Sequence, residues 1–270
     1  MISSFNSLNN HIKLQILTAL KNLVTHRSLQ NRLENLGFVV DMVNLLDTKE
    51  SSEVRLAVVM ILSSICKLSP ARQEQAVLAG VIPLLLDCIE EHGKLQQLSI
   101  SLLCSFVSAS VACRAYLHKF DVFSSFISLL EKNLVVFDAI SSWAVYEPNK
   151  CKKYFLQEKN FNICVEVFNK NDDESVQCMV RIIRSSDEVA VVAGKNKKFL
   201  QGVYSKLAKC LDNALKAKNC LELLLAVASR HPKPKQMLEE NNFYSVISKI
   251  LRSSRDENLV VIEEIASLFL

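Results

Sequence analysis

Nine cysteines and five histidines are the residues of this chain that could ligate a metal or act as nucleophiles. The cysteines are never closer than nine positions apart, and no histidine stands at metal-ligand spacing from a cysteine or an acid. Most cysteines lie in apolar stretches such as SLLCSF, where a free thiol behaves as a small buried hydrophobe. The sequence therefore predicts structural thiols in a reducing compartment, without disulfides and without a metal site.

Acidic pairs such as Glu90–Glu91 and Glu239–Glu240 could in principle act as a general acid and base. They stand in polar loops or on helix faces, however, where a solvated surface is the simpler interpretation. The five glycines are scattered and form no phosphate-binding loop, and the protein-kinase signatures HRD and DFG are absent. We therefore predict that this chain is not an enzyme and carries no cofactor.

Lysines form the most distinctive polar pattern, because they gather in three groups that each precede an apolar segment. Between positions 195 and 218, seven lysines stand against one acid, Asp212. If the groups align in space they form a basic ridge that attracts an acidic or phosphorylated protein. A solvated, solubilising surface is the alternative. The candidate binding residues are Lys150, Lys152, Lys153, Lys195, Lys197, Lys198, Lys233 and Lys235.

Nucleic acid is a poor candidate partner for these lysines. The net charge is only +4, and aromatic residues are not interleaved with the lysines as a base-stacking platform requires. Charges interrupt every apolar run before it could span a membrane, and the N-terminus lacks the pattern of a signal peptide. The sequence thus predicts a cytoplasmic protein with a protein partner, and neither nucleic acid nor membrane.

The elements that position these residues recur at a regular interval. Apolar segments follow short turns, and their starts lie 38 to 44 residues apart. Each segment is followed by a longer helix with apolar residues at i, i+3, i+4 and i+7. A short third helix precedes most of the segments. The unit between 195 and 219 is the least regular. The segments begin at Gly37, Gly80, Asp121, Asn160, Lys198 and Asn242.

Three helices in about 40 residues are typical of armadillo repeats, whereas two would indicate HEAT repeats. We predict an all-α, armadillo/HEAT-like, right-handed superhelical solenoid of about six repeats that forms a single domain over 1–270. The chain begins and ends partway through a unit, which suggests a piece of a longer polypeptide. The apolar terminal stretch Leu259–Leu270 also leaves self-association open.

One known armadillo function can be tested on the residues directly. Importin-alpha-type arrays bind basic peptides through tryptophan and asparagine residues that lie four positions apart and recur on successive helices. This chain has a single tryptophan, Trp143, and Glu147 follows it four residues later. The pattern excludes a nuclear-import receptor of that kind and favours Trp143 as a packing residue over a binding hot spot.

Two windows resemble a particular group of armadillo domains. These are SRHPKPKQMLEENNFYSVISKIL (Ser229–Leu251) and VFDAISSWAVYEPNKCKKYFLQEKNF (Val136–Phe161). They are similar to the region C-terminal to the kinase domain in septation-initiation and mitotic-exit network kinases of fungi. Plant epsilon-class MAP-kinase-kinase-kinases are related to the same group.

The resemblance implies a docking module in cell-division signalling. In that family the non-kinase region binds a small Ras-like GTPase in its GTP state and helps to place the kinase at the spindle pole body. A GTPase surface or a phosphorylated scaffold peptide is compatible with the acidic partner expected from the lysines. The alternative is an unrelated armadillo adaptor that binds an extended peptide in its concave groove.

Overall fold

A computed structural model describes residues 5, 7–47, 50–67, 69–171, 173–210, 213–253 and 259–267. Within these ranges the regular structure is helical, and no strand occurs. Contacts within the chain divide it into two compact units, 1–123 and 124–270. The all-α, armadillo-like repeat architecture expected from the sequence is confirmed, and each unit is described in turn.

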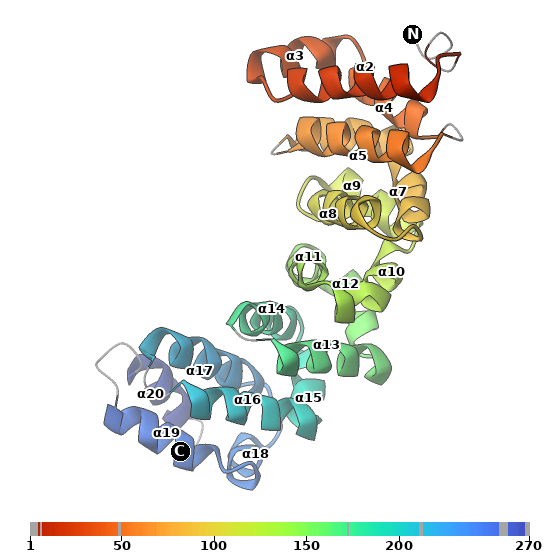
Figure 1. Ribbon diagram of the computed structural model, residues 1–270. Coiled ribbons are helices and arrows are strands. Elements are labelled where there is room, and N and C mark those ends of the chain that lie inside the picture. Colours follow the sequence, from red (N-terminus) through yellow and green to blue (C-terminus); the bar gives the residue numbers. More distant parts are fainter. Residues whose placement is uncertain are drawn as a thin grey trace. The chain divides into compact units, whose positions relative to one another are not determined.

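The first unit repeats one long helix followed by two short ones. The long helices α2, α5 and α8 pack on one another in succession (Figure 1), while α4 packs on α7 and α6 on α9. Each kind of helix thus contacts its counterpart one repeat away. The helices are α2 (Asn10–Leu23), α3 (Arg27–Asn35), α4 (Phe38–Leu46), α5 (Ser52–Cys66), α6 (Pro70–Leu78), α7 (Val81–Ile89), α8 (Lys94–Val107) and α9 (Val111–Lys119).

The second unit repeats this plan. Its long helices α11, α14, α17 and α20 pack in succession, and α13, α16 and α19 form a parallel series. The unit boundary falls within α10. The elements are α10 (Val122–Leu129), the 3-10 turn η1 (Leu130–Lys132), α11 (Leu134–Tyr146), α12 (Pro148–Phe155), α13 (Glu158–Lys170), α14 (Asp173–Arg184), α15 (Asp187–Lys195), α16 (Lys197–Lys209), α17 (Ala214–Ala228), α18 (Pro234–Glu240), α19 (Phe243–Ser253) and α20 (Leu259–Ser267).

Local sequence signals explain where many of these helices start. Proline occupies the first turn of three short helices, where its missing amide proton leaves no hydrogen bond unmade. These prolines are Pro70, Pro148 and Pro234. Several other helices begin after a side chain that accepts a hydrogen bond from an amide of the first turn. These N-caps are Asn9, Ser51, Ser110, Asn133, Asn196 and Asn213.

The turn between the last two helices of a repeat uses left-handed backbone in four repeats. Gly37, Gly80, Asp121 and Asn242 have positive φ there, a conformation that glycine, asparagine and aspartate tolerate best. The segment expected to start at Asn160 behaves differently. Its helix α13 already begins at Glu158, because Gln157 is extended and no left-handed residue breaks the chain at 160.

Each unit has a core of buried apolar residues between its helices. Trp143 is fully buried on α11, where its ring meets Phe126 edge-on at a centroid distance of 6.4 Å. Its indole Nε1 donates to the Glu147 Oε2 at 2.8 Å. The interpretation of Trp143 as a packing residue is therefore confirmed.

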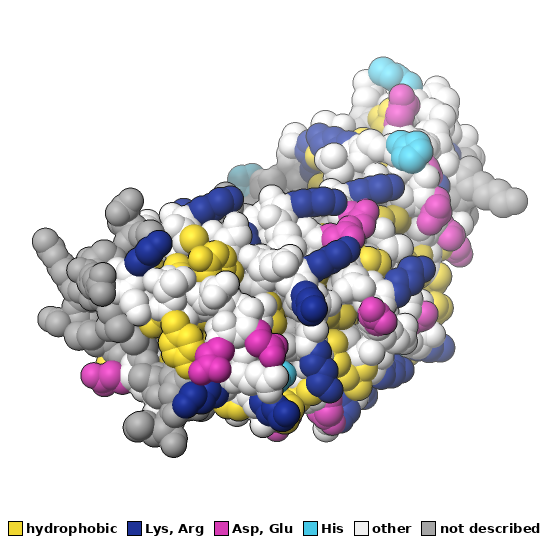
Figure 2. All heavy atoms as spheres, turned by 90° about the horizontal axis from the view of Figure 1, so that it is seen from below, with side chains coloured by type: hydrophobic (Ala, Val, Ile, Leu, Met, Phe, Trp, Pro, Cys, Tyr) yellow, Lys and Arg dark blue, Asp and Glu magenta, His cyan; other side chains and the backbone are white. Residues whose placement is uncertain are grey.

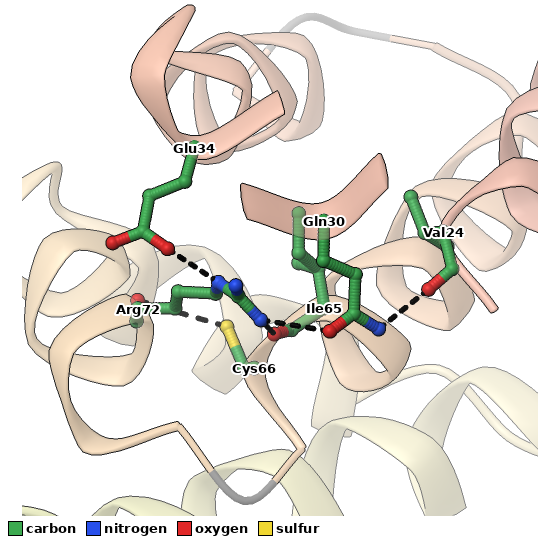
Figure 3. A network of polar contacts seen from close by, with 6 residues as sticks. All are labelled: Val24, Gln30, Glu34, Ile65, Cys66 and Arg72. Carbon is green, nitrogen blue, oxygen red and sulfur yellow. Dashed lines mark hydrogen bonds and ion pairs between the residues drawn. The ribbon is translucent and has the colours of Figure 1, made fainter. Parts of the chain in front are cut away.

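Buried polar side chains close the C-terminal ends of long helices in the first unit. Arg72 on α6 donates from Nη1 to the Ile65 carbonyl at 3.3 Å and to Gln30 Oε1 at 2.8 Å (Figure 3). Its Nε donates to Glu34 Oε2 at 2.7 Å. One repeat later, Arg114 donates to the Val107 carbonyl at 3.0 Å. Because helix ends leave carbonyls without intrahelical partners, these arginines tie each short helix to the long helix before it.

The unit between 195 and 219, which the sequence presents as least regular, has the ordinary three-helix order. Its short helix α15 is followed by a break of one residue before α16. At the C-terminal end of the chain, Val261 and Ile265 of α20 are buried and α20 packs on α17 and α19. Residues 268–270 of the predicted self-association segment lie outside the described residues, as does Asp212.

Candidate functional site

A hollow of about 630 Å³ opens in the second unit between α16 and α18. Three of the predicted lysines line it, Lys195 at the end of α15, Lys197 at the start of α16 and Lys233 before α18. We call this site the lysine groove. Its other lining residues are Gly194, Leu200, Gln201, His231, Pro232, Gln236, Met237, Glu240 and Asn241.

Helical spacing explains why these residues face one another. Lys197, Gln201 and Tyr204 lie one and two turns apart on the same face of α16. Lys233, the residue before α18, and Gln236 and Glu240 of that helix follow a similar spacing. Both helices therefore present a lysine first and continue with an amide side chain.

The floor of the lysine groove is apolar and tightly packed. Leu200 and Met237 are each only 3 % exposed, so they form a fixed base beneath the polar side chains. At the edge of the groove, a Cβ atom added to Gly194 would lie 2.6 Å from Cδ2 of His231. A glycine at this position thus allows α15 to end directly against the turn before α18.

The groove continues as a second hollow of about 300 Å³ in which no lysine takes part. Leu200, Gln201, Glu240 and Asn241 line both hollows, and Tyr204 and Asn242 complete the second. Positive charge is therefore concentrated at one end of the groove. The carboxylate of Glu240, which accepts a hydrogen bond from Gln236 Nε2 at 2.7 Å, lies farther along.

The ammonium groups of Lys195, Lys197 and Lys233 are exposed and make no ion pair or hydrogen bond within the described residues. Lys198 and Lys235 are likewise exposed without such a partner, but they do not line the groove. Figure 2 views the molecule from the side on which α18 and α19 lie in Figure 1 and shows Lys and Arg side chains interspersed with acidic and hydrophobic ones.

The group on α12 has a different environment. Lys150 Nζ lies 2.7 Å from Glu147 Oε1, and Lys153 Nζ lies 4.9 Å from the centre of the Tyr154 ring. Lys152 Nζ donates to Glu188 Oε1 on α15 at 2.8 Å. Hydrogen bonds from Lys152 and from Ser186 lower the pKa of Glu188 to about 2. These lysines already have partners within the chain, so they are less available to a ligand.

Residues that the sequence interpretation missed include Gln201, Gln236, Glu240 and Asn241. Glu240 was assigned to solvated surface, yet it lines the groove that also holds Lys233. A usable signal was present, because lysine, amide and a further polar residue recur with one-turn spacing in KKFLQGVY and KPKQMLEEN. That the two faces oppose each other depends on the packing of α16 and α18.

The described residues contain no group of three or more His, Cys, Asp or Glu side chains that could hold a metal ion. All nine cysteines are free thiols, eight of them buried and Cys104 half-buried. Burial raises the pKa of Cys164 to about 12, which disfavours the reactive thiolate. Among the described helices, none combines the length and the apolar character needed to cross a membrane.

A further hollow, of about 610 Å³, lies within the first unit along α5, α6 and α8. Hydroxyl and amide groups of Ser63, Gln73, Ser101 and Ser105 line it beside apolar side chains. The Ser63 hydroxyl is buried and has no hydrogen-bond partner in the described residues. This first-unit hollow has polar groups at the surface of long helices, but only Lys67 contributes charge to it.

Comparison with known proteins gives relatives but no matching family model. MAP3K epsilon protein kinase 2 of Arabidopsis thaliana is 26% identical over 270 residues, which covers 95% of this chain and 19% of the kinase. Cell division control protein 7 of Schizosaccharomyces pombe is 27% identical over 154 residues, covering 54% of this chain and 14% of that protein. The chain thus spans about a fifth of the plant kinase it matches.

Cytokinesis protein sepH of Aspergillus niger is 22% identical over 194 residues, which covers 66% of this chain and 14% of that protein. Among solved structures, an engineered protein superposes with a TM-score of 0.67 at 15% identity, covering 97% of this chain and 75% of the other. That likeness concerns the fold alone. The resemblance drawn from Val136–Phe161 and Ser229–Leu251 is confirmed, and the chain is related to a region that the MAP3K epsilon protein kinases share with fungal cell-division and cytokinesis proteins.

Proposed function

We propose that this chain is a non-catalytic docking domain of a cell-division signalling kinase and that it binds a protein partner through the lysine groove. The partner is a small Ras-like GTPase in its GTP form, a spindle-pole-body scaffold, or both. Binding localises the kinase from the cytoplasm to the spindle pole body and activates it. The observation that carries the proposal is the set of exposed, unneutralised lysines at one end of a preformed groove.

Two further observations support a docking role over catalysis. The relatives are kinases or are named for cell division and cytokinesis, and the chain corresponds to a small part of each. The described residues offer a groove with an apolar floor and polar walls but no cluster of metal ligands, and burial raises the pKa of eight of the nine thiols. Such a surface suits recognition of another protein.

The decisive experiment is a pull-down of the pathway's small GTPase, loaded with GDP or with a non-hydrolysable GTP analogue. We expect selective capture of the GTP form. Reversal of Lys195, Lys197 and Lys233, the three lysines that line the groove, to glutamate should weaken capture by more than about tenfold, because long-range attraction becomes repulsion. Equal capture of both nucleotide forms would remove the GTPase-effector role and leave the scaffold as partner.

A matched control reverses Lys94, Lys132 and Lys170 to glutamate. These lysines are exposed and lie outside the lysine groove. Because three lysines are reversed in both variants, the change in net charge is the same. Capture should survive in the control variant. If both triple variants lose the GTPase equally, net charge and not the groove governs binding.

The first-unit hollow, lined by Ser63, Gln73 and Ser101, favours one alternative, an adaptor that binds an extended peptide along α5 and α8. Ser63, Gln73 and Ser101 could hydrogen-bond the main chain of such a peptide. Panning a random peptide library against the chain would enrich binders, and Ser101→Leu would abolish their binding if they occupy this hollow. Loss of binding in Lys197→Glu instead would assign them to the lysine groove.

A further inference from the structure

We infer that the lysine groove recognises a segment of a partner protein that carries a single phosphoserine or phosphothreonine, with the phosphate held between Lys195, Lys197 and Lys233. This inference rests on the proposed docking function and specifies the chemistry of its partner. The phosphate is the group that the lysines bind, and the neighbouring residues of the segment are not acidic.

Three lysines lining one hollow favour a compact dianion. Lys195, Lys197 and Lys233 have exposed side chains and line the hollow of about 630 Å³, and none of their ammonium groups has a counter-ion in the described part of the chain. A phosphate carries nearly two negative charges and three acceptor oxygens, so one group can bind several lysines at once. The amide side chains of Gln201 and Gln236 stand one turn farther along each helix and can donate to the neighbouring main chain of the segment.

Glu240 argues against an acid-rich tract as the occupant. Its carboxylate lines the same groove beyond the lysines and also lines the continuing hollow toward Tyr204. A run of aspartates or glutamates along the groove would bring like charges together at this point, which costs binding energy. A single phosphorylated residue places all of its charge at the lysine end and avoids Glu240.

The floor supplies a second element of specificity. Leu200 and Met237 are almost fully covered by the chain itself, yet both line the hollow. An apolar side chain next to the phosphorylated residue can rest on this surface, and a hydrogen-bond donor farther along can reach Glu240. The expected motif is therefore phosphoserine or phosphothreonine, then an apolar residue, then a residue that is not acidic.

The test uses the whole 270-residue chain and three bead-bound peptide libraries with degenerate flanks. Their central residue is fixed as phosphoserine, serine or aspartate. We expect at least about tenfold more retention by the phosphoserine library than by either of the others, as charged hydrogen bonds of this kind allow. Equal retention by the aspartate library, or no retention by any library, would overturn the inference.

Matched lysines provide the controls. Lys197→Glu and Lys233→Glu should abolish the preference for phosphoserine, whereas Lys198→Glu and Lys235→Glu should retain it, because those two residues do not line the groove. An acid at the first position of α16 also favours the helix, so Lys197→Glu is expected to fold. Lys197→Gln removes the positive charge without adding a negative one, so it should also reduce the preference for phosphoserine. A loss shared by all four variants would contradict the site.

A gain-of-function variant gives independent evidence. Glu240→Lys extends positive charge along the groove and should let the chain retain peptides with glutamates on one side of the phosphoserine. No change in flank preference would contradict the placement of the segment. The GTPase pull-down separates the two proposals: capture without phosphopeptide binding refutes this inference alone, and phosphopeptide binding without capture refutes only the GTPase partner.

Discussion

Arg72 on α6 reaches back to α3, where its Nε donates to Glu34 Oε2 at 2.7 Å across 38 positions of sequence. The same relationship recurs in both units, since ion pairs join residues that lie 36 to 43 positions apart, one repeat along the chain. Electrostatic contacts thus connect neighbouring repeats within each unit. The pairs include Lys13–Glu50, Arg55–Glu91, Asp138–Arg181, Lys152–Glu188, Asp173–Lys216, Arg184–Glu222 and Asp187–Arg230.

Burial predicts that these pairs differ in their contribution to stability. Arg72→Met should lower the free energy of unfolding by about 2–3 kcal/mol, because it removes several hydrogen bonds and leaves the Ile65 carbonyl without that donor. Arg72→Lys should not restore the loss, since an ammonium cannot reproduce the planar fork of donors. Urea unfolding followed by circular dichroism measures both.

Arg181→Met is the comparison for this prediction. Its partner Asp138 is 65% exposed, so the pair is screened by solvent and the variant should lose no more than about 1 kcal/mol. Similar losses for Arg72→Met and Arg181→Met would show that burial does not rank these ion pairs.

Left-handed backbone at Gly80 predicts a graded response to substitution. Its φ is +92°, and an added Cβ would meet no atom within 4 Å, so the cost is conformational and not steric. Gly80→Ala should lose about 1–2 kcal/mol of stability, and Gly80→Asn should lose less because asparagine tolerates this region. Thermal unfolding of the two variants measures the order, and an alanine variant as stable as the parent would contradict it.

The pair of Lys152 and Glu188 predicts a defined pH response. The folded pKa of Glu188 is lowered from 4.5 to about 2, so its contribution to stability is present above about pH 4.5 and is lost as pH falls through 2. An NMR titration of the side-chain carboxyl measures this pKa directly. Lys152→Ala should shift it upward toward the ordinary value, whereas an unchanged pKa would mean that another group holds the carboxylate.

The cysteines should differ in reactivity in the native state. Burial raises the pKa of Cys66, Cys151 and Cys164 to about 12, whereas Cys104 is half-buried. We expect N-ethylmaleimide at neutral pH to modify Cys104 first and Cys164 only on unfolding. Mass spectrometry of peptides after brief labelling locates the modified thiols, with urea-unfolded protein as the reference for full labelling. Early labelling of Cys164 would indicate local opening of α13.

Much of the architecture follows from local sequence. Local signals predict which helices occur and in what order along the chain. These signals are apolar periodicity, glycine at the turns before α4 and α7, and proline at the starts of α6 and α12. These signals act within a few residues, so a single sequence contains them. Helix α15 escaped the interpretation although its sequence carries boundary signals, with Ser186 at the N-cap, Asp187 and Glu188 in the first turn and Lys195 in the last. In the structure, α15 packs against α14, α16 and α17.

The sequence by itself determined the repeat, the absence of catalytic motifs and the positions of the lysines. Only the tertiary structure decided which lysines are available to a partner. Lys152 is paired with Glu188, 36 residues away, while Lys197 and Lys233 share one groove with Glu240. The physical reason is that the partners of a side chain lie one repeat away or on the next helix. The rotation and spacing of the packed helices therefore decide which of several charged side chains come within reach.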